Sequence, residues 1–240
     1  EGFMIITGAG PGIMGAAQKG AGADNSFGLN IRLPFEQDAN DTIEGDPKLV
    51  PFNYFFTRKL TFVKESEGFA LFAGGFGTMD EGFEVLTLIQ TGKTAILPLV
   101  MVDAPGASYW KTFDAFLRNE LLSRRLISED DFALFRITDD IEEAVHEFKH
   151  FYRVFHSYRF VRDKLVIRLQ RRLSDTHIER LNADFSDLVK SGTITQGTAL
   201  PQEADEESLT HLPRLIFTPH RRNYGRLRRL IDAINDCAPS

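Results

Sequence analysis

The chain has 240 residues, of which 42% are hydrophobic and 26% are charged, and its formal net charge at pH 7 is -6. This composition is ordinary for a soluble globular protein with a sizeable core, and the mild negative charge argues against wholesale binding of nucleic acid. No apolar run approaches the roughly 20 residues that a membrane helix needs, and the single cysteine, Cys237, excludes an intramolecular disulfide and predicts a cytoplasmic protein.

The first ten residues, EGFMIITGAG, already lie inside a predicted strand and contain neither an initial Met nor a signal-like segment. We therefore expect an upstream strand and helix of the same domain to be missing from this sequence.

From Phe3 to about His150, apolar runs alternate with segments of helical periodicity, which predicts βα units around a mainly parallel sheet. The polar, turn-rich segment 38–48 is expected to be a mobile surface loop. The predicted strands are 3–7, 27–34, 68–73 and 94–102, and the predicted helices are 13–22, 53–65, 79–91, 109–123 and 139–152.

After about Phe155 the pattern changes, and it predicts a small α+β appendage over residues 156–240. Its acidic run QEADEES (202–208) is expected to be a solvated linker. Its predicted strands are 163–169, 192–200 and 213–219, and its predicted helices are 175–190 and 223–235. The fold class predicted for the chain is therefore α/β: a Rossmann-like, doubly wound parallel sheet over residues 1–155, followed by this appendage.

The first glycine-rich turn, TGAGPGIMG, follows the strand 3–7 and places Gly10, Gly12 and Gly15 in a G-x-G-x-x-G pattern. The next strand carries Asn30 and Arg32 where a dinucleotide fold would carry an acidic residue for the ribose, which argues against NAD. A ligand-contacting turn and a tight turn that merely needs glycines both remain open.

The second glycine-rich loop lies in LFAGGFGTMDEGFE (71–84), where Gly74, Gly75, Gly77 and Thr78 join a strand to a helix. The free N–H groups and the dipole of a helix start favour an anion in such a loop. It is not a Walker loop, because no Lys-Ser or Lys-Thr pair follows the glycines.

Acidic residues follow this loop at once, and their simplest interpretation is structural. Thr78 and Glu81 have the spacing of a capping box, with Thr78 as N-cap and Glu81 at the third helical position. Asp80 is expected to be a surface residue favoured by the helix dipole.

Arg58 interrupts the aromatic-rich helix 53–65, where it is expected beside Tyr54 and Phe62. This helix precedes the strand that leads into the second glycine loop, so its basic group could reach the edge of the sheet where ligands of open α/β folds bind. A surface or salt-bridging arginine is the alternative.

Arg58-Lys59 followed by AGGFGTMDE resembles the R-K and P-G-G-x-G-T-x-x-E signature of the Lonely-guy (LOG) family, whose members are often labelled lysine decarboxylases. GAGPGIMGAAQKGA resembles the first glycine turn of the same family, and the resemblance covers residues 3 to about 150. The family's proline is Ala73 here, which removes no functional group. Residues 151–240 resemble the tail of larger bacterial relatives that cleave ordinary nucleoside monophosphates.

The resemblance implies hydrolysis of the N-glycosidic bond of a nucleoside 5′-monophosphate, such as AMP, to free base and ribose 5-phosphate. It makes Glu81 the catalytic glutamate and Arg58 its partner. The substrate would be held by further residues of both motifs: Gly10, Gly12, Met14, Lys59, Gly74, Gly75, Gly77, Thr78 and Glu84. A non-catalytic nucleotide-binding or carrier protein of the same fold is the alternative function.

We expect no metal, because no metal-ligand spacing appears, and no cofactor. A decarboxylase would need a lysine that forms a Schiff base with pyridoxal phosphate, and nothing around Lys59 or Lys93 suggests one.

Two expectations concern partners. The family resemblance, together with the Phe-rich helices 53–65 and 109–123, predicts a homodimer or higher homo-oligomer. The basic stretch FTPHRRNYGRLRR (217–229) places Arg221 and Arg222 before a helix start, where they could bind a phosphorylated nucleotide effector or a partner's acidic surface. A solvated helix end with i, i+4 ion pairs is the alternative.

Overall fold

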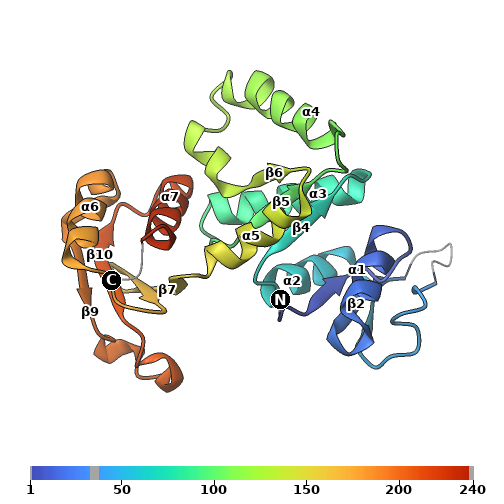
Figure 1. Ribbon diagram of the computed structural model, residues 1–240, viewed down its shortest axis with the longest axis horizontal. Helices are drawn as coiled ribbons and strands as arrows, with labels where there is room; N and C mark the ends of the chain where they lie inside the picture. Colours follow the sequence, from blue (N-terminus) through green and yellow to red (C-terminus); the bar gives the residue numbers. More distant parts are fainter. Residues whose placement is uncertain (1, 33–37, 238–240) are drawn as a thin grey trace. The chain divides into compact units, whose positions relative to one another are not determined.

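The computed structural model describes residues 2–32 and 38–237, and the chain forms two compact units, Glu1–Glu67 and Gly68–Ser240. The domain boundary predicted near residue 155 lies inside the second unit and stays a prediction. In both units parallel strands alternate with helices, which confirms the α/β class (Figure 1). Unit 2 also carries an antiparallel sheet in its C-terminal part.

Unit 1 is a three-stranded parallel sheet of order β1-β2-β3 with two helices. Register pairs Ile6 with Phe27 and Leu29 with Val50. Leu29 is buried in its core. The elements are β1 (Ile5–Thr7), α1 (Ile13–Ala21), a 3-10 turn (Ala23–Asn25), β2 (Ser26–Ile31), β3 (Leu49–Phe52) and α2 (Phe55–Glu65). The end of the strand predicted over 27–34 falls outside the described residues.

The segment 38–48, predicted as a mobile surface loop, lies at the surface for most of its length, and two of its residues attach it to the core of unit 1. The Asn40 amide donates to the carbonyl oxygens of Ala9 and Gly10 at 3.0 and 3.2 Å, and to the Gln18 side chain at 2.6 Å. Ile43 is fully buried. Asn40 and Ile43 thus make tertiary contacts that the polar, turn-rich composition of this segment does not predict.

The first part of unit 2 is a parallel sheet of order β4-β5-β6, with α3 and α5 beside it in Figure 1. Its buried strand β5 is four residues long, shorter than the predicted strand 94–102, because Pro98 cannot donate to a neighbouring strand. The elements are β4 (Phe69–Phe72), α3 (Phe76–Gln90), β5 (Leu99–Val102), α4 (Tyr109–Phe116), a π-helical segment (Leu117–Leu122), a 3-10 helix (Glu129–Leu134), β6 (Arg136–Thr138) and α5 (Ile141–Phe151).

The C-terminal part of unit 2 is an antiparallel sheet of order β7-β8-β10-β9 with two helices, as an α+β pattern requires. Strand β7 was not predicted; it pairs with β8 through a tight hairpin at Arg162, a non-glycine residue with φ 56°. The elements are β7 (Phe155–Val161), β8 (Lys164–Leu169), α6 (Asp175–Asp184), a 3-10 turn (Ser186–Leu188), β9 (Val189–Gly197), two 3-10 turns (Pro201–Glu203 and Glu207–Leu209), β10 (Arg214–Pro219) and α7 (Tyr224–Asn235).

The prediction that 202–208 is a solvated linker is wrong at Glu203, which is fully buried. Its carboxylate accepts from Arg168 at 2.9 Å and from Arg214 at 3.3 Å, and both arginines are buried as well. Buried charges need such partners. Through Glu203, the acidic run is therefore bound to the antiparallel sheet.

Helix α7 packs directly on the rest of unit 2. A Cβ atom at Gly225 would overlap the backbone of Asp130, so glycine allows this close approach. The Asp130 carboxylate accepts from Asn223 at 2.7 Å and from Arg229 at 3.0 Å. The α5–α7 contact adds an ion pair between Arg228 and Glu147.

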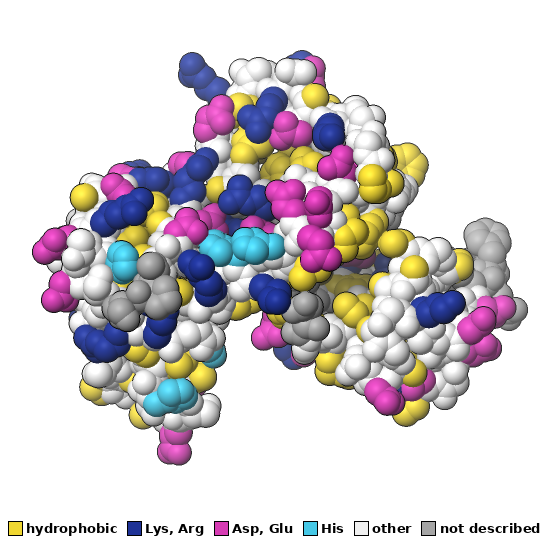
Figure 2. All heavy atoms as spheres, viewed as in Figure 1, with side chains coloured by type: hydrophobic (Ala, Val, Ile, Leu, Met, Phe, Trp, Pro, Cys, Tyr) yellow, Lys and Arg dark blue, Asp and Glu magenta, His cyan; other side chains and the backbone are white. Residues whose placement is uncertain are grey.

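The visible face interleaves basic and acidic side chains (Figure 2). Within the described part of the chain, no helix combines the length and apolar character needed to cross a membrane.

Candidate functional site

The second glycine loop connects β4 to α3, and its three glycines have different explanations. None of them has a positive φ, so backbone conformation does not demand glycine. A Cβ atom at Gly74 would overlap the Thr78 side chain, whereas Cβ atoms at Gly75 and Gly77 would meet nothing within 4 Å. Contacts within the protein therefore explain Gly74 but not Gly75 or Gly77, where the missing side chains leave the backbone N–H groups open to a ligand.

Helix α3 begins earlier than predicted, and this overturns the capping-box interpretation. Its first residue is Phe76 and its N-cap is Gly75, with no capping hydrogen bond from a side chain. Thr78 thus lies inside the first turn, and Glu81 is the sixth helical residue. Glu81 is too far along the helix to satisfy its N-terminal N–H groups.

Glu81 instead shares a face of α3 with the glycine loop. Gly77, Glu81 and Glu84 follow one another at i, i+4 and i+7, and residues at this spacing line one side of a helix. Helical side chains lean toward the N-terminus. A Cβ atom at Gly77 would meet nothing within 4 Å, so the space beside the start of the helix is open at this residue. Glu81 is half-buried and Glu84 is exposed.

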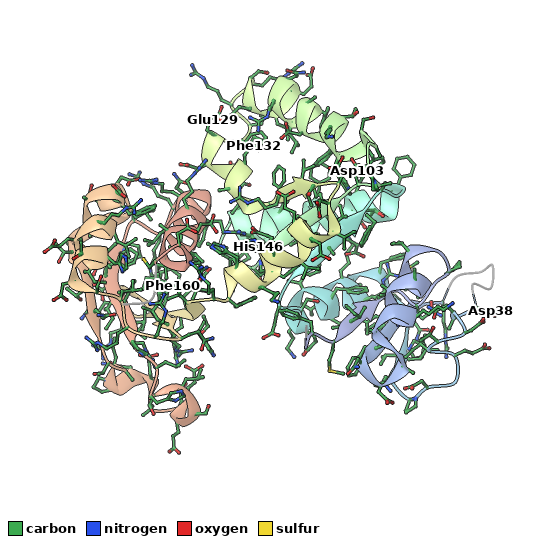
Figure 3. The ribbon with its side chains drawn as sticks, viewed as in Figure 1. Asp38, Asp103, Glu129, Phe132, His146 and Phe160 are labelled. Atoms are coloured by element: carbon green, nitrogen blue, oxygen red, sulfur yellow. The ribbon has the colours of Figure 1, made fainter. Side chains whose placement is uncertain are left out.

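Tyr109, at the start of α4, holds the glycine loop from outside. Its hydroxyl donates to the Gly74 carbonyl oxygen at 2.6 Å. The next residue, Trp110, donates from its backbone N–H to Asp103 at 3.0 Å and from its ring to the Val102 carbonyl at 3.2 Å. Asp103 directly follows β5 (Figure 3), so the end of one strand fixes the loop that follows the neighbouring strand.

Arg58 lies in unit 1 and is half-buried in helix α2. Its guanidinium carbon lies 5.1 Å from the ring centre of Phe55 and 5.9 Å from that of Phe62, so the predicted contact with Phe62 is confirmed and Phe55 takes the place expected for Tyr54. One guanidinium nitrogen lies 4.0 Å from the position of a Cβ atom at Gly8, so Arg58 reaches the first glycine turn. Lys59 is half-buried beside it.

The first glycine turn also belongs to unit 1, and part of it has a structural explanation. Gly12 is the N-cap of α1 with φ 70°, a conformation that favours glycine. The carbonyl oxygen of the buried Gly10 accepts from Asn40. The Met14 sulfur lies 3.0 Å from the position of a Cβ atom at Gly8, on the same turn that Arg58 reaches.

The predicted site residues thus gather in two groups, one in each unit. Unit 1 holds Gly10, Gly12, Met14, Arg58 and Lys59, and unit 2 holds Gly74, Gly75, Gly77, Thr78, Glu81 and Glu84. Two supporting residues were missed, Asn40 and Tyr109. Each acts over about 30 residues or more of sequence, and no local pattern signals such a contact.

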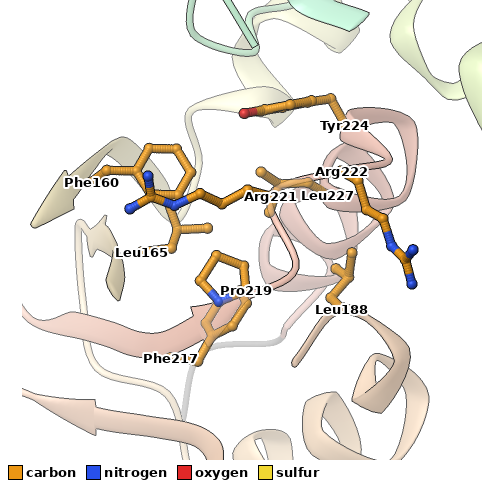
Figure 4. Close-up of a pocket in the computed structure, with 9 residues that line it drawn as sticks. All are labelled: Phe160, Leu165, Leu188, Phe217, Pro219, Arg221, Arg222, Tyr224 and Leu227. Carbon is orange, nitrogen blue, oxygen red and sulfur yellow. The ribbon is translucent and has the colours of Figure 1, made fainter. Parts of the chain in front are cut away.

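The basic stretch 217–229 does not form a converging pair of guanidinium groups. Arg221 stacks over the Phe160 ring, with its guanidinium carbon 4.5 Å from the ring centre, and donates to the Arg162 carbonyl. The Arg222 side chain extends to the other side of the turn (Figure 4). Arg226 pairs with Asp187 at 3.0 Å, and Arg228 pairs with Asp232 four residues on at 2.8 Å. Only the Arg228–Asp232 pair has the i, i+4 spacing of the alternative, and Arg228 is buried, so the alternative describes only part of this stretch. Binding of a phosphorylated effector stays a prediction.

Over residues 2–32 and 38–237, no three His, Cys, Asp or Glu side chains are grouped so that they could hold a metal ion. His146, on α5 (Figure 3), stacks on His150. His150 contacts Asp236 at 3.0 Å.

Comparison with known protein families decides the family. A family model described as "possible lysine decarboxylase" matches residues 14–148, more than half of the chain. The chain belongs to this family, the Lonely-guy (LOG) family. The match includes Arg58, the second glycine loop and Glu81, and it ends near the end of α5. Gly10 and Gly12 precede it, and the antiparallel sheet follows it. No curated protein matches the chain closely enough to be reported as a relative.

Membership of the LOG family suggests a hydrolase that acts on nucleotides.

Proposed function

We propose that this LOG-family protein hydrolyses the N-glycosidic bond of nucleoside 5′-monophosphates, AMP among them, and releases free base and ribose 5-phosphate. Among the members of this family, we propose that the chain is of the larger bacterial type.

One observation carries the proposal: Glu81 lies on the same face of α3 as Gly77 and has no capping role. The loop before it offers open backbone N–H groups at Gly75 and Gly77. A helix start of this kind favours a phosphate. A carboxylate directed toward a bound phosphate would be unfavourable, but a carboxylate directed at the sugar that carries this phosphate is useful.

The chemistry explains why negative charge is useful there. As the bond from C1′ to the base nitrogen breaks, its electron pair leaves with the base and C1′ becomes cationic. A nearby anion stabilises that charge. Water then adds to C1′, Glu81 accepts its proton, and the departing base gains a proton. General base catalysis of this kind contributes about 10²- to 10⁴-fold in rate.

Other residues have supporting roles in the proposal. Gly74, Gly75, Gly77 and Thr78 hold the 5′-phosphate, and Glu84 is a second carboxylate on the face of Glu81. Arg58 interacts with the phosphate, the ribose or the departing base, and Lys59, Gly10, Gly12 and Met14 contribute to substrate binding. The stacking of Arg58 on two phenylalanines supports a fixed orientation of its guanidinium.

The test is incubation with AMP, CMP, GMP and UMP, with chromatographic detection of free base and ribose 5-phosphate. The matched control is the corresponding nucleosides, which lack the phosphate and should react far more slowly. Release of base from at least one nucleotide is expected. If every nucleotide binds and none is cleaved, the protein is a nucleotide-binding or carrier protein instead.

We also propose a cytoplasmic homodimer or higher homo-oligomer. Helix α2 and the residue before it expose large apolar side chains, at Tyr54, Phe55, Phe56 and Leu60. Exposed apolar clusters commonly mark interfaces. Light scattering at micromolar concentration should give at least twice the mass of one chain, and a monomer would exclude the proposal.

A further inference from the structure

The hydrogen bond from Tyr109 to Gly74 determines which way one peptide group of the glycine loop points. The hydroxyl donates to the Gly74 carbonyl oxygen at 2.6 Å, across 35 residues of sequence. The peptide bond that joins Gly74 to Gly75 is planar and trans, so its C=O and its N–H point in opposite directions. When Tyr109 holds the Gly74 oxygen, it therefore directs the Gly75 N–H away from α4.

Tyr109 itself is well anchored. Its ring packs edge-on against Trp110, with ring centres 4.9 Å apart, and Trp110 is 1% exposed. Trp110 makes two buried hydrogen bonds, to Asp103 and to the Val102 carbonyl, and packs against Phe113 with ring centres 5.5 Å apart. The hydroxyl thus projects from a rigid support, as a group that orients a binding loop must.

The Gly75 N–H is one of the groups that the proposed phosphate site needs. Gly75 is the N-cap of α3, and the N–H groups at a helix start have no acceptor within the helix. These are the donors that bind phosphate at helix N-termini. A glycine loop is flexible, so the direction of this N–H depends on an external constraint.

We propose that Tyr109 is a positioning residue for phosphate binding: it orients the Gly74–Gly75 peptide so that the Gly75 N–H faces the 5′-phosphate. The inference rests on the proposed function only in that the ligand carries a phosphate at this loop. Tyr109 takes no part in bond cleavage. Its loss should weaken binding in the ground state and the transition state alike, which raises KM and leaves kcat unchanged.

The experiment measures the binding of ribose 5-phosphate by calorimetry, and nucleotide cleavage in parallel, for the wild type and Tyr109→Phe. The substitution keeps the ring and removes the hydroxyl. We expect the Kd for ribose 5-phosphate to rise about threefold to tenfold, the range of one hydrogen bond. KM for the nucleotide should rise by the same factor, with kcat within about twofold of the wild type. Binding of the unphosphorylated nucleoside should not change.

Tyr158→Phe is the matched control. The Tyr158 hydroxyl also bonds to a backbone group of unit 2, accepting from the Ile96 N–H at 3.2 Å, but it does not touch the glycine loop. Both variants lose one such hydrogen bond, so a general loss of stability affects both. Only Tyr109→Phe should weaken ribose 5-phosphate binding.

A second pair of variants tests the proposed route through Gly75. Gly75→Pro removes the N–H at a φ of -88°, near the range of proline, and Gly75→Ala keeps the N–H where the added Cβ meets nothing within 4 Å. Both variants add atoms beside the proposed phosphate, and only proline also removes the N–H, so we expect Gly75→Pro to weaken ribose 5-phosphate binding by a larger factor than Gly75→Ala does. Adding Tyr109→Phe to Gly75→Pro should then cause no further loss, because the group that Tyr109 orients is gone.

The outcomes separate this inference from the proposed hydrolysis. Weaker ribose 5-phosphate binding in Tyr109→Phe supports the inference even if no nucleotide is cleaved. Unchanged binding in Tyr109→Phe overturns it even if the wild type cleaves nucleotides. Equal losses in Tyr109→Phe and Tyr158→Phe, a fall in kcat alone, or a wild type that does not bind ribose 5-phosphate would also overturn it.

Discussion

The side chain of Thr78 folds back against Gly74: a Cβ atom added at Gly74 would lie 3.0 Å from the Thr78 Cβ and overlap its hydroxyl. This contact lets α3 begin at Phe76, directly after the glycine pair. Real Cβ atoms do not approach other atoms so closely, so either the loop or Thr78 must move when residue 74 has a side chain.

The loop therefore offers a matched pair of variants. Gly74→Ala should raise the KM for a nucleoside monophosphate by about tenfold or more, because it displaces the backbone that would hold the phosphate. Gly75→Ala adds the same methyl group at a permitted φ where no protein atom lies within 4 Å, so it leaves the loop in place and its KM should rise by a smaller factor than that of Gly74→Ala. Steady-state kinetics on both variants provide the check. Equal effects would mean that the Thr78 contact does not shape the loop.

Local sequence patterns predicted the class of fold and most elements of unit 2. Strand β8 and helix α5 were predicted to within two residues because their apolar periodicity is strong. Strand β3 was missed because Pro51 interrupts it, and β6 because it carries a single apolar residue, Ile137. Glu203 looked solvated because its partners, Arg168 and Arg214, are distant in sequence.

For the site, the motif residues could be predicted but their local geometry could not. Thr78 and Glu81 have the spacing of a capping box. Helix α3 nevertheless begins at Phe76, three residues before the predicted start, and Gly75 is the N-cap. The hydrogen bond from Tyr109 holds the loop directly before the helix, and it is a tertiary interaction across 35 residues. Propensity is a weak guide where such contacts compete with it.

Arg58→Lys should lower kcat/KM by about tenfold or more although the charge is retained. The planar guanidinium stacks beside Phe55 and Phe62, and an ammonium group has neither its shape nor its paired donors. Lys64→Arg is the control on the same helix, at an exposed lysine that pairs with Glu65 at 3.2 Å, and it should behave as the wild type. If Arg58→Lys keeps the wild-type kcat/KM, then Arg58 acts only through its positive charge, and the shape of its guanidinium does not matter.

Glu203 should make unit 2 sensitive to acid. Burial raises the pKa of Glu203, but hydrogen bonds from the Leu200 N–H, Arg214 and Arg168 outweigh it, so the pKa lies below its ordinary value of 4.5. A carboxyl group whose pKa is lowered by folding stabilises the fold above its unfolded pKa, and this contribution is lost as the pH falls through the folded value.

The free energy of unfolding should therefore fall from about pH 5 downward, and Glu203→Gln should flatten this dependence. At neutral pH the variant should be less stable by about 3 kcal/mol, because two buried arginines lose a counter-charge. The single tryptophan, Trp110, is buried in unit 2 and reports its unfolding by urea through fluorescence. The exposed Glu207→Gln is the control. Identical pH profiles for the wild type and Glu203→Gln would show that this ion cluster is not the acid-sensitive element.

The central claim is that Glu81 performs chemistry and does not cap a helix. Its most direct test is base release by Glu81→Gln, measured beside nucleotide binding on the same preparation, with the neighbouring exposed Asp80→Asn as control. Because Glu81 lies beyond the first turn of α3, the variant should fold and bind nucleotide with an affinity within about threefold of the wild type. Its rate of base release should fall by about 10²-fold or more, whereas Asp80→Asn should retain its activity. A Glu81→Gln variant that binds nucleotide and keeps most of the wild-type rate would contradict the claim.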